Sequence, residues 1–321
     1  MPERTLLCLS SIIRDFSRVA LDSLIRNLLP NLPGELVILG HSPPGNEKLI
    51  EVLRPHCRQL IWKFEADPSI SADELSMNLR AESRINVVKN NLLQWNSIAQ
   101  CERLKQEFEA QNGRADLVAW TRPDLLYLWD ADIPRYVPPG VLYLSPHDMW
   151  RGFNDRLSIG DSATMSKRMQ LSQYFRTNWY PRLVENPDQM LGGQETNWNP
   201  EYVLGCFLKE NGIKVRESYT HFCRLRKIQG RFYGMTPHRN SARYYFPEIV
   251  ENDDRGPVRD RFNKQFQKLM ALSNSRGSLM DPRAIRYITG PRQFLQYLMQ
   301  RGDFTRRMVP LERLLKLETT A

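Results

Sequence analysis

The chain has 321 residues, of which 41% are hydrophobic and 25% charged, and its formal net charge at pH 7 is +9. This length and composition exclude a disordered chain and suffice for one large or two ordinary globular domains. The five cysteines are scattered, odd in number and never spaced as Cys-x-x-Cys. They indicate neither a disulfide framework nor a zinc site, and we expect a reducing, cytoplasmic compartment.

The positive charge is concentrated in the C-terminal quarter. Residues 236–321 contain 16 Lys and Arg against 9 Asp and Glu, an excess of 7, which leaves an excess of 2 for residues 1–235. A basic region of this kind could contact a membrane surface, an anionic polymer or nucleic acid, although a solvated basic face is the commoner explanation. A polyanion or nucleic-acid binding protein is therefore one function that the composition leaves open.

Apolar runs alternate with helical patterns in the first part of the chain. The strand pattern covers 6–13, 35–40 and 59–65, and the helical pattern covers 16–29 and 47–53. This alternation predicts an α/β fold, in which a mostly parallel sheet is covered by helices on both faces. The first apolar run is too short for a membrane span and resembles a buried strand more than a signal peptide.

The longest helical pattern covers 85–109 and ends at Gly113, and its apolar stripe is expected to pack on the core. Further strands are predicted at 117–120 and 141–145. Residues 158–165 are predicted to form a loop or turn before a helix over 166–179.

The last elements of the first domain are a short helix and an extended segment. The helix is predicted over 200–211, with proline at its start and glycine just past its end, and the extended segment over 213–226. Beyond Gly234, prolines punctuate basic helical pieces. We therefore predict a domain over 1–235 and a basic, mainly helical C-terminal extension over 236–321.

The strand at 117–120 leads into an Arg-Pro-Asp turn, which is the most informative feature of the sequence. Pro123 cannot donate to a sheet ladder, so regular pairing should stop near it and present Arg122 and Asp124 at the carboxyl edge of the strand. Ligands bind at that edge in open α/β sheets, and an arginine beside an aspartate offers a phosphate clamp next to a ligand for a divalent cation. The alternative is a surface ion pair that caps the strand.

Two more loops should reach the same edge if the sheet is doubly wound. The first follows the first strand and contains Ser10, Ser11 and Arg14, which could receive a base or a phosphate near a helix N-terminus. This loop lacks glycine, and a plain helix cap is the alternative. The second covers 147–156, after the strand at 141–145.

The loop over 147–156 combines aromatic, amide and carboxylate side chains. Carbohydrate hydroxyls are bound by such sets, and Trp150, Phe153, Asn154 and Asp155 supply one within six residues. A carboxylate here could act as general base on an acceptor hydroxyl, with Asp155 the first candidate and Asp148 the second. The alternative is a surface turn.

Four short segments in order carry a resemblance to a known family. They are Gln-Trp-Asn-Ser-Ile-Ala-Gln-Cys at 94–101, the strand and turn at 116–125, Gly-Phe-Asn-Asp-Arg-Leu-Ser-Ile-Gly at 152–160, and Asn-Pro-Glu at 199–201. Together they make the chain resemble the nucleotide-sugar-dependent glycosyltransferases of the GT-A type, in the branch found in bacterial and large-virus glycan synthesis. The resemblance covers about residues 4 to 230.

The resemblance implies the GT-A fold, with a Rossmann-like, mixed and mostly parallel sheet flanked by helices. It also implies a nucleoside diphosphate sugar as donor, such as a UDP-sugar, a glycan or other hydroxyl group as acceptor, and Mn²⁺ or Mg²⁺ as cofactor. The transferred group would be a hexosyl or pentosyl unit. No nucleic-acid partner is expected from this resemblance, and residues 236–321 could make a peripheral contact with a membrane.

Carried over to this chain, Asp124 takes the second acidic place of the family's D-x-D element and would coordinate the metal. Arg122 takes the place of the first acid. This R-x-D departure leaves one protein carboxylate for a metal and lets the arginine bind the donor directly. His221 is so placed in the sequence that it could complete the metal shell, and a core or surface histidine is the alternative.

The remaining site residues are also implied by the resemblance. Trp95, Asn154 and Arg224 would contact the donor, with Arg224 facing its diphosphate. Trp150, Phe153 and Glu201 would contact the acceptor. Glu201 begins a predicted helix, where the helix dipole favours a carboxylate, so helix capping is its default role.

Overall fold

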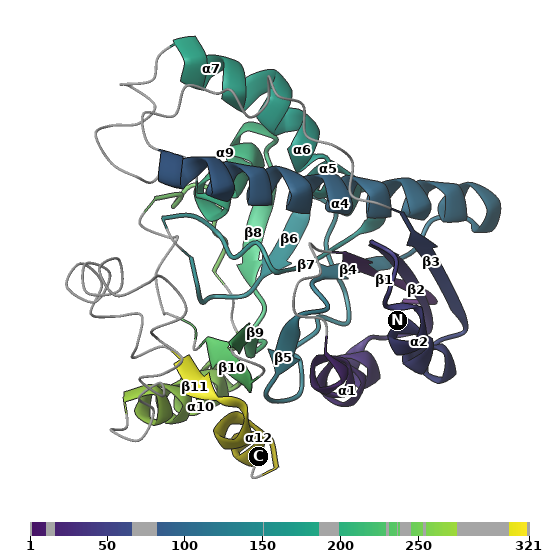
Figure 1. The fold of residues 1–321 in the computed structure, drawn as a ribbon. Helices are drawn as coiled ribbons and strands as arrows, with labels where there is room; N and C mark the ends of the chain where they lie inside the picture. Colours follow the sequence, from purple (N-terminus) through teal and green to yellow (C-terminus); the bar gives the residue numbers. More distant parts are fainter. Residues whose placement is uncertain are drawn as a thin grey trace.

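The structure is a computed structural model, and it describes residues 2–10, 17–65, 82–149, 151–185, 199–228, 231–235, 237, 245–252, 255–274 and 308–319. It has a large central sheet with helices on both faces and a smaller sheet beside it (Figure 1). None of the helices within these ranges is long and apolar enough to cross a bilayer.

The large sheet has seven strands in the order β3-β2-β1-β4-β7-β6-β8. Their bounds are β1 Arg4–Ser10, β2 Glu35–Ser42, β3 Gln59–Phe64, β4 Leu117–Thr121, β6 Val141–Leu144, β7 Leu157–Gly160 and β8 Lys214–Glu217. β7 is antiparallel to β4 and β6, and the other neighbouring pairs are parallel. The sheet is therefore mixed and mostly parallel, and the predicted α/β fold is confirmed.

Alternating side chains of the central strands supply two separate cores. Leu6 and Cys8 of β1 pack toward one face, whereas Leu7 and Leu9 pack toward the other. Both sets are buried because helices cover both faces, so these strands read as continuous apolar runs. On one face lie α4 Glu82–Asn112, α5 Ser162–Met169, α6 Leu171–Tyr174 and α9 Pro200–Glu210, and on the other α1 Arg18–Asn27 and α2 Glu47–Ile50 (Figure 1).

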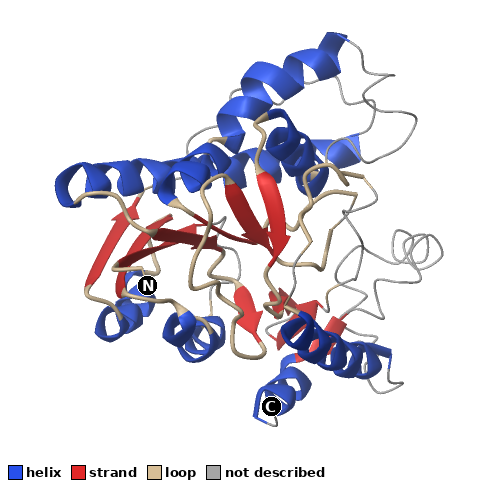
Figure 2. Cartoon of the chain, turned by 180° about the vertical axis from the view of Figure 1, so that it is seen from behind, coloured by secondary structure: helices blue, strands red, loops and turns tan. Residues whose placement is uncertain are grey.

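The smaller sheet is antiparallel, with the order β11-β10-β9-β5. Its strands are β5 Leu125–Tyr127, β9 Phe222–Ile228, β10 Arg231–Met235 and β11 Met308–Pro310. α10 Gly256–Asn274 and α12 Leu311–Thr319 lie against it (Figure 2). Because β10 pairs with β11, the described residues on the two sides of the predicted boundary near residue 235 share one sheet.

Two predictions of local structure are wrong. Residues 157–160, predicted to lie mostly in a loop, form β7, which pairs with β4 along its whole length and with β6 from Ser158 to Gly160. The segment 213–226, predicted as one extended piece, is divided between β8 in the large sheet and β9 in the small one. Neither outcome depends on local sequence alone, since each short strand is stabilised by neighbours distant along the chain.

The helix predicted over 166–179 begins earlier than expected and is not regular. Asp161 caps α5, its side chain accepting from the backbone N–H of Thr164. After α6 the chain continues in a π-helical stretch, Phe175–Trp179, followed by α7 Tyr180–Glu185. The helices α4 and α9 match their predicted positions to within a few residues, and Gly113 ends α4 with a positive φ of 80°.

The C-terminal helix should contribute to stability as a core element. Leu314 is fully buried against Val309 and Leu225, and its side chain fills the space above Gly234. We expect Leu314→Ala to lower the free energy of unfolding by about 2–5 kcal/mol, measured by urea denaturation. Glu312→Ala, an exposed change on the same helix, should cost less than about 1 kcal/mol. Equal effects of the two variants would contradict this packing.

Candidate functional site

The strand order reverses between β1 and β4. The chain places β2 and β3 on one side of β1 and then returns to place β4 on the other side. In open α/β sheets, ligands bind outside the carboxyl ends of the strands at such a point. β1 ends at Ser10 and β4 ends at Thr121, so the turn that begins with Arg122 lies where a ligand is expected.

Other segments reach the same edge of the sheet. β6 runs parallel to β4 and ends at this edge, and β7 runs antiparallel and begins there, so the loop 145–156 lies along it. β8 also ends there and leads into β9 of the small sheet. The predicted convergence of the loops after β4 and β6 is therefore confirmed, whereas residues 11–16, after β1, lie outside the described residues.

Arg122 and Asp124 form a buried bidentate ion pair. Arg122 Nε donates to Asp124 Oδ1 at 2.8 Å and Nη2 donates to Oδ2 at 2.7 Å, while Nη1 donates to the side-chain oxygen of Gln94 on α4 at 2.8 Å. The exposed fractions of Arg122 and Asp124 are 8% and 2%, so the alternative of a surface ion pair is wrong. Arg226 adds a contact from β9, with Nη1 3.4 Å from Asp124 Oδ2.

The charge state of Asp124 is fixed by its arginines. Burial alone would raise the pKa of this carboxyl, but Arg122, with Arg226 and Arg224 behind it, lowers the pKa to about 2. Asp124 is therefore ionised at every physiological pH, and its negative charge is matched by more than one guanidinium group.

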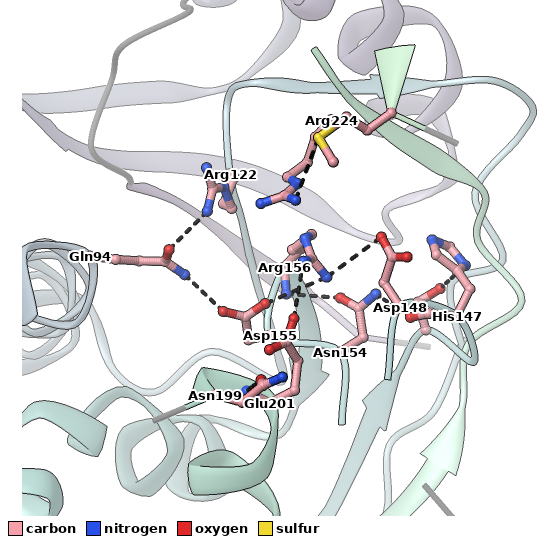
Figure 3. A network of polar contacts seen from close by, with 12 residues as sticks. Gln94, Arg122, His147, Asp148, Asn154, Asp155, Arg156, Asn199, Glu201 and Arg224 are labelled. Atoms are coloured by element: carbon pink, nitrogen blue, oxygen red, sulfur yellow. Dashed lines mark hydrogen bonds and ion pairs between the residues drawn. The ribbon is translucent and has the colours of Figure 1, made fainter. Parts of the chain in front are cut away.

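Arg156 is the centre of a second set of ion pairs (Figure 3). Its Nη2 donates to Glu201 Oε1 at 3.0 Å, and its Nη1 lies 3.6 Å from Asp155 Oδ1 and 3.7 Å from Asp148 Oδ2. Gln94 joins the two sets, because its amide nitrogen donates to Asp155 Oδ2 at 3.2 Å. One connected network therefore links α4, the turn after β4, the loop before β7 and the start of α9.

The backbone beneath this network is tightly packed. A Cβ added at Gly152 would lie 1.9 Å from the carbonyl oxygen of Glu201, and the N–H of Phe153 donates to that same oxygen at 3.0 Å. Asp148 and Arg151 have positive φ values of 54° and 55°, which are uncommon for residues other than glycine. Backbone of this kind is concentrated at functional sites, and Asp148 is one of the carboxylates close to Arg156.

Arg224 lies among other cations. Burial, and then the charges of Arg156, Arg226 and Arg122, lower its pKa to about 9. Its Nη2 lies 3.6 Å from the sulfur of Met235, and its Nε is buried without a hydrogen-bond partner among the described residues. Figure 3 shows the guanidinium groups of Arg122, Arg224 and Arg156 turned toward the same region.

Arg168 braces the loop that carries Asp155 from within the core. This fully buried side chain of α5 donates from Nε to Ser158 Oγ at 3.0 Å, and its guanidinium carbon lies 4.6 Å from the centre of the Trp120 ring. Its Nη2 lies 3.4 Å from the backbone oxygen of Asp155. The arginine thereby fixes the position of the loop that carries Asp155.

The site gathers equal numbers of cationic and acidic side chains. Four arginines, 122, 156, 224 and 226, face the four carboxyl groups of Asp124, Asp148, Asp155 and Glu201. Burial and the charge of Asp155 raise the pKa of Glu201 to about 8, although Arg156 opposes this. Arg224 has no carboxylate hydrogen-bond partner among the described residues, and a cation in that state favours an anionic ligand.

Several predicted ligand-binding residues are core or bracing residues instead. Trp95 is 1% exposed and packs on Phe175, and Phe153 is 2% exposed and packs on Phe246. Asn154 is fully buried and braces its own loop, donating to the carbonyl oxygen of His147 and accepting from the N–H of Arg156. None of the three side chains faces solvent as a platform for donor or acceptor.

The other predicted residues fall into two groups. Ser10 is buried, and its hydroxyl accepts from the indole nitrogen of Trp120 at 2.8 Å, which holds the end of β1 against β4. Ser11, Arg14 and Trp150 lie outside the described residues.

His221 is not beside Asp124. β5 and β9 pair with Leu125 opposite Arg224, so Asp124 lies near Leu225, four residues and roughly 13 Å along β9 from His221. The His221 ring stacks on Phe262 at 3.8 Å between ring centres, and its Nε2 lies 3.2 Å from the Phe262 carbonyl oxygen. His221 is therefore a core residue, which is the alternative given for it in the sequence analysis, and it does not share a metal with Asp124.

The donor set at the turn does not fit a divalent cation. Both carboxylate oxygens of Asp124 already accept charge-assisted hydrogen bonds from Arg122, and the neighbouring carboxylates pair with Arg156. In the part of the chain that the structure describes, no three His, Cys, Asp or Glu side chains are grouped as metal ligands. Arginines occupy the places around Asp124 that further oxygen ligands would need.

The residues that join the network have only weak signals in the sequence. Gln94 lies in the segment 94–101 that carries the resemblance, but the resemblance implies Trp95, not Gln94, as a donor contact. Arg156 stands immediately before a short apolar strand, and Arg168 stands on the buried side of a helix. A charged residue at a position that the pattern marks as buried is the feature that could have identified both.

Comparison with known proteins does not assign the chain to a family. No protein-family model matches it, and no curated protein is detectably similar to it in sequence.

Gly152 should tolerate no side chain. Gly152→Ala places a Cβ against the backbone of Glu201, so we expect the start of α9 to shift and the free energy of unfolding to fall by about 1–3 kcal/mol. Gly256→Ala is the matched control, because nothing lies within 4 Å of the added Cβ, and it should change stability by less than about 1 kcal/mol. Equal stability of the two variants in urea would contradict the close approach.

The protonation of Glu201 should appear in the pH dependence of stability. Its pKa of about 8 in the folded chain lies above the ordinary value of about 4.3 in the unfolded chain, so between these values the folded chain holds a proton that the unfolded chain releases. The contribution is fully present below the unfolded pKa and is lost as the pH rises through the folded one. Relative to Glu201→Gln, the free energy of unfolding of the wild type should therefore fall from about pH 5 to pH 9, and parallel curves would contradict this.

Proposed function

We propose that this protein is a glycosyltransferase of the GT-A type, which transfers a sugar from a nucleoside diphosphate sugar to a hydroxyl group of a glycan or other acceptor. The observation that carries the proposal is the gathering of Arg122, Arg156, Arg224 and Arg226, the arginine cluster, at the point where the strand order reverses. The mixed, mostly parallel sheet and the four-segment resemblance are consistent with it.

A diphosphate leaving group suits the arginine cluster chemically. When the bond between the anomeric carbon and the diphosphate oxygen breaks, the electron pair leaves with the diphosphate and its negative charge grows. Cationic donors that are fixed in advance and partly shielded from water stabilise that growing charge without having to reorganise. The Arg122 and Arg156 side chains meet this condition, because Asp124 in the turn after β4 and Glu201 at the start of α9 hold them in place.

The acceptor hydroxyl needs a base beside the sugar. Its oxygen forms the new bond to the anomeric carbon, and its proton passes to a carboxylate. Asp155 remains the first candidate, because Gln94 orients its carboxylate next to Arg156. Asp148 remains the second and is more exposed, with 16% of its side-chain surface accessible against 4% for Asp155.

The proposal is tested by a panel of donors. Purified protein is mixed with UDP-, GDP-, CDP- and dTDP-linked sugars, and thermal melting and release of nucleoside diphosphate are recorded. We expect one donor class to raise the melting temperature and to be hydrolysed slowly without acceptor. If instead only nucleic acid stabilises the protein, and that effect falls steeply with salt, the polyanion-binding function suggested by the basic residues 236–321 is the better account.

The proposed base has its own test. Asp155→Asn should lower turnover with the active donor by at least about 100-fold and change the affinity for the corresponding nucleoside diphosphate by less than about threefold. Asp161→Asn, which alters the cap of α5 outside the network, is the control and should retain turnover. Loss of turnover in Asp148→Asn but not in Asp155→Asn would reassign the base.

A further inference from the structure

Both carboxylate oxygens of Asp124 are paired with arginine in this structure. Its two carboxylate oxygens take three contacts from guanidinium groups, two from Arg122 and one from Arg226. A carboxylate that coordinates a divalent cation offers at least one oxygen to the ion at about 2.0–2.6 Å. Here both oxygens are in contact with guanidinium groups, whose positive charge repels a cation. The pair with Arg122 is buried, and such pairs are costly to break once formed.

Arg224, in contrast to Asp124, has no oppositely charged hydrogen-bond partner among the described residues. Its Nη2 donates to the thioether sulfur of Met235, a weak acceptor, and its buried Nε has no acceptor among the described residues. Unsatisfied buried donors are rare in folded proteins, and a charged one beside three other arginines is more costly still. An anion placed among Arg224, Arg122 and Arg156 would satisfy those donors and relieve the repulsion between like charges.

We infer that the arginine cluster alone binds and neutralises the donor's diphosphate, without a divalent cation, and that Asp124 is a positioning residue for Arg122 and Arg226 rather than a metal ligand. This inference rests on the proposed function and assigns the diphosphate site within it. Arginine is suited to this role because its planar guanidinium group makes paired hydrogen bonds to phosphate oxygens and stays charged on burial.

The connected ion pairs support this division of roles. Asp124 holds Arg122 on one side, and Glu201, Asp155 and Asp148 hold Arg156 on the other, so both guanidinium groups are positioned before any ligand arrives. Arg224 and Arg226 come from β9 of the small sheet and approach the same place. A diphosphate there would contact both sheets at once.

The experiment measures binding of inorganic pyrophosphate and UDP to the full chain by isothermal titration calorimetry. The protein is freed of metal with excess EDTA, and the titrations are repeated with Mn²⁺ and with Mg²⁺. We expect both probes to bind in EDTA, with dissociation constants that change by less than about threefold when either cation is added.

Two variants and one control locate the site. Arg224→Gln should weaken pyrophosphate binding by about tenfold or more in EDTA, since a hydrogen-bonded charge is lost. Arg58→Gln removes the same charge just before β3, at the opposite edge of the sheet, and should leave binding unchanged. Asp124→Asn removes the negative charge but keeps one acceptor oxygen for Arg122, so binding in EDTA should persist, and any weakening should be the same with and without Mn²⁺ or Mg²⁺. Circular dichroism confirms that each variant is folded.

The outcomes separate this inference from the proposed function. Binding that vanishes in EDTA and returns with Mn²⁺ or Mg²⁺ would overturn the inference and leave glycosyl transfer intact. Binding of neither pyrophosphate nor UDP under any condition, together with no response to the donor panel, would overturn the proposed function as well. Equal weakening by Arg224→Gln and Arg58→Gln would show general charge attraction and would also overturn the inference.

Discussion

The buried ion pairs of Arg122 with Asp124, and of Arg156 with its three carboxyl groups, are the interactions on which the organisation of this edge of the sheet depends. Removing water from so many charges is expensive, and loss of one partner typically costs about 3–5 kcal/mol because the other charge is left buried and unpaired. Such a network is a weak source of net stability. Its effect is to fix the direction of each charged group, which is what electrostatic stabilisation of a reacting ligand requires.

The fold holds this network by joining elements that are distant along the chain. Gln94 reaches it from the middle of α4, and α4 is held against α5 by the buried Lys105, whose Nζ lies 3.0 Å from Glu109 Oε2 and 2.7 Å from Ser166 Oγ. Gly152 lets the loop before β7 approach the start of α9 closely. The carboxylates that surround Arg156 are therefore set by packing between helices as much as by their own loop.

The sequence was sufficient for five of the seven strands of the large sheet and for one part of the site. Apolar runs such as Leu6–Leu9 predict strands from local sequence, and Pro123, two residues after β4, predicts where that strand ends, so β1, β2, β3, β4, β6 and the Arg122–Asp124 turn are predicted correctly. The aromatic residue Phe153 was assigned to an acceptor because composition does not tell whether a ring faces solvent or the core, and Phe246, which covers it, is distant in sequence. β7 is not predicted because its four residues form a strand only by pairing with β4 and β6, which are distant in sequence.

The described part of the C-terminal region bears on the site through its apolar residues. Along β9, alternate side chains point to opposite faces, and Cys223 and Leu225 are buried with Val309 and Leu314 of the chain's end. Arg224 and Arg226 must then point to the other face, toward Asp124. A slip of one residue in the pairing of β9 with β5 would exchange these faces and bury the arginines among apolar side chains. Packing of α12 and β11 on the small sheet therefore selects the register that directs both arginines to the site.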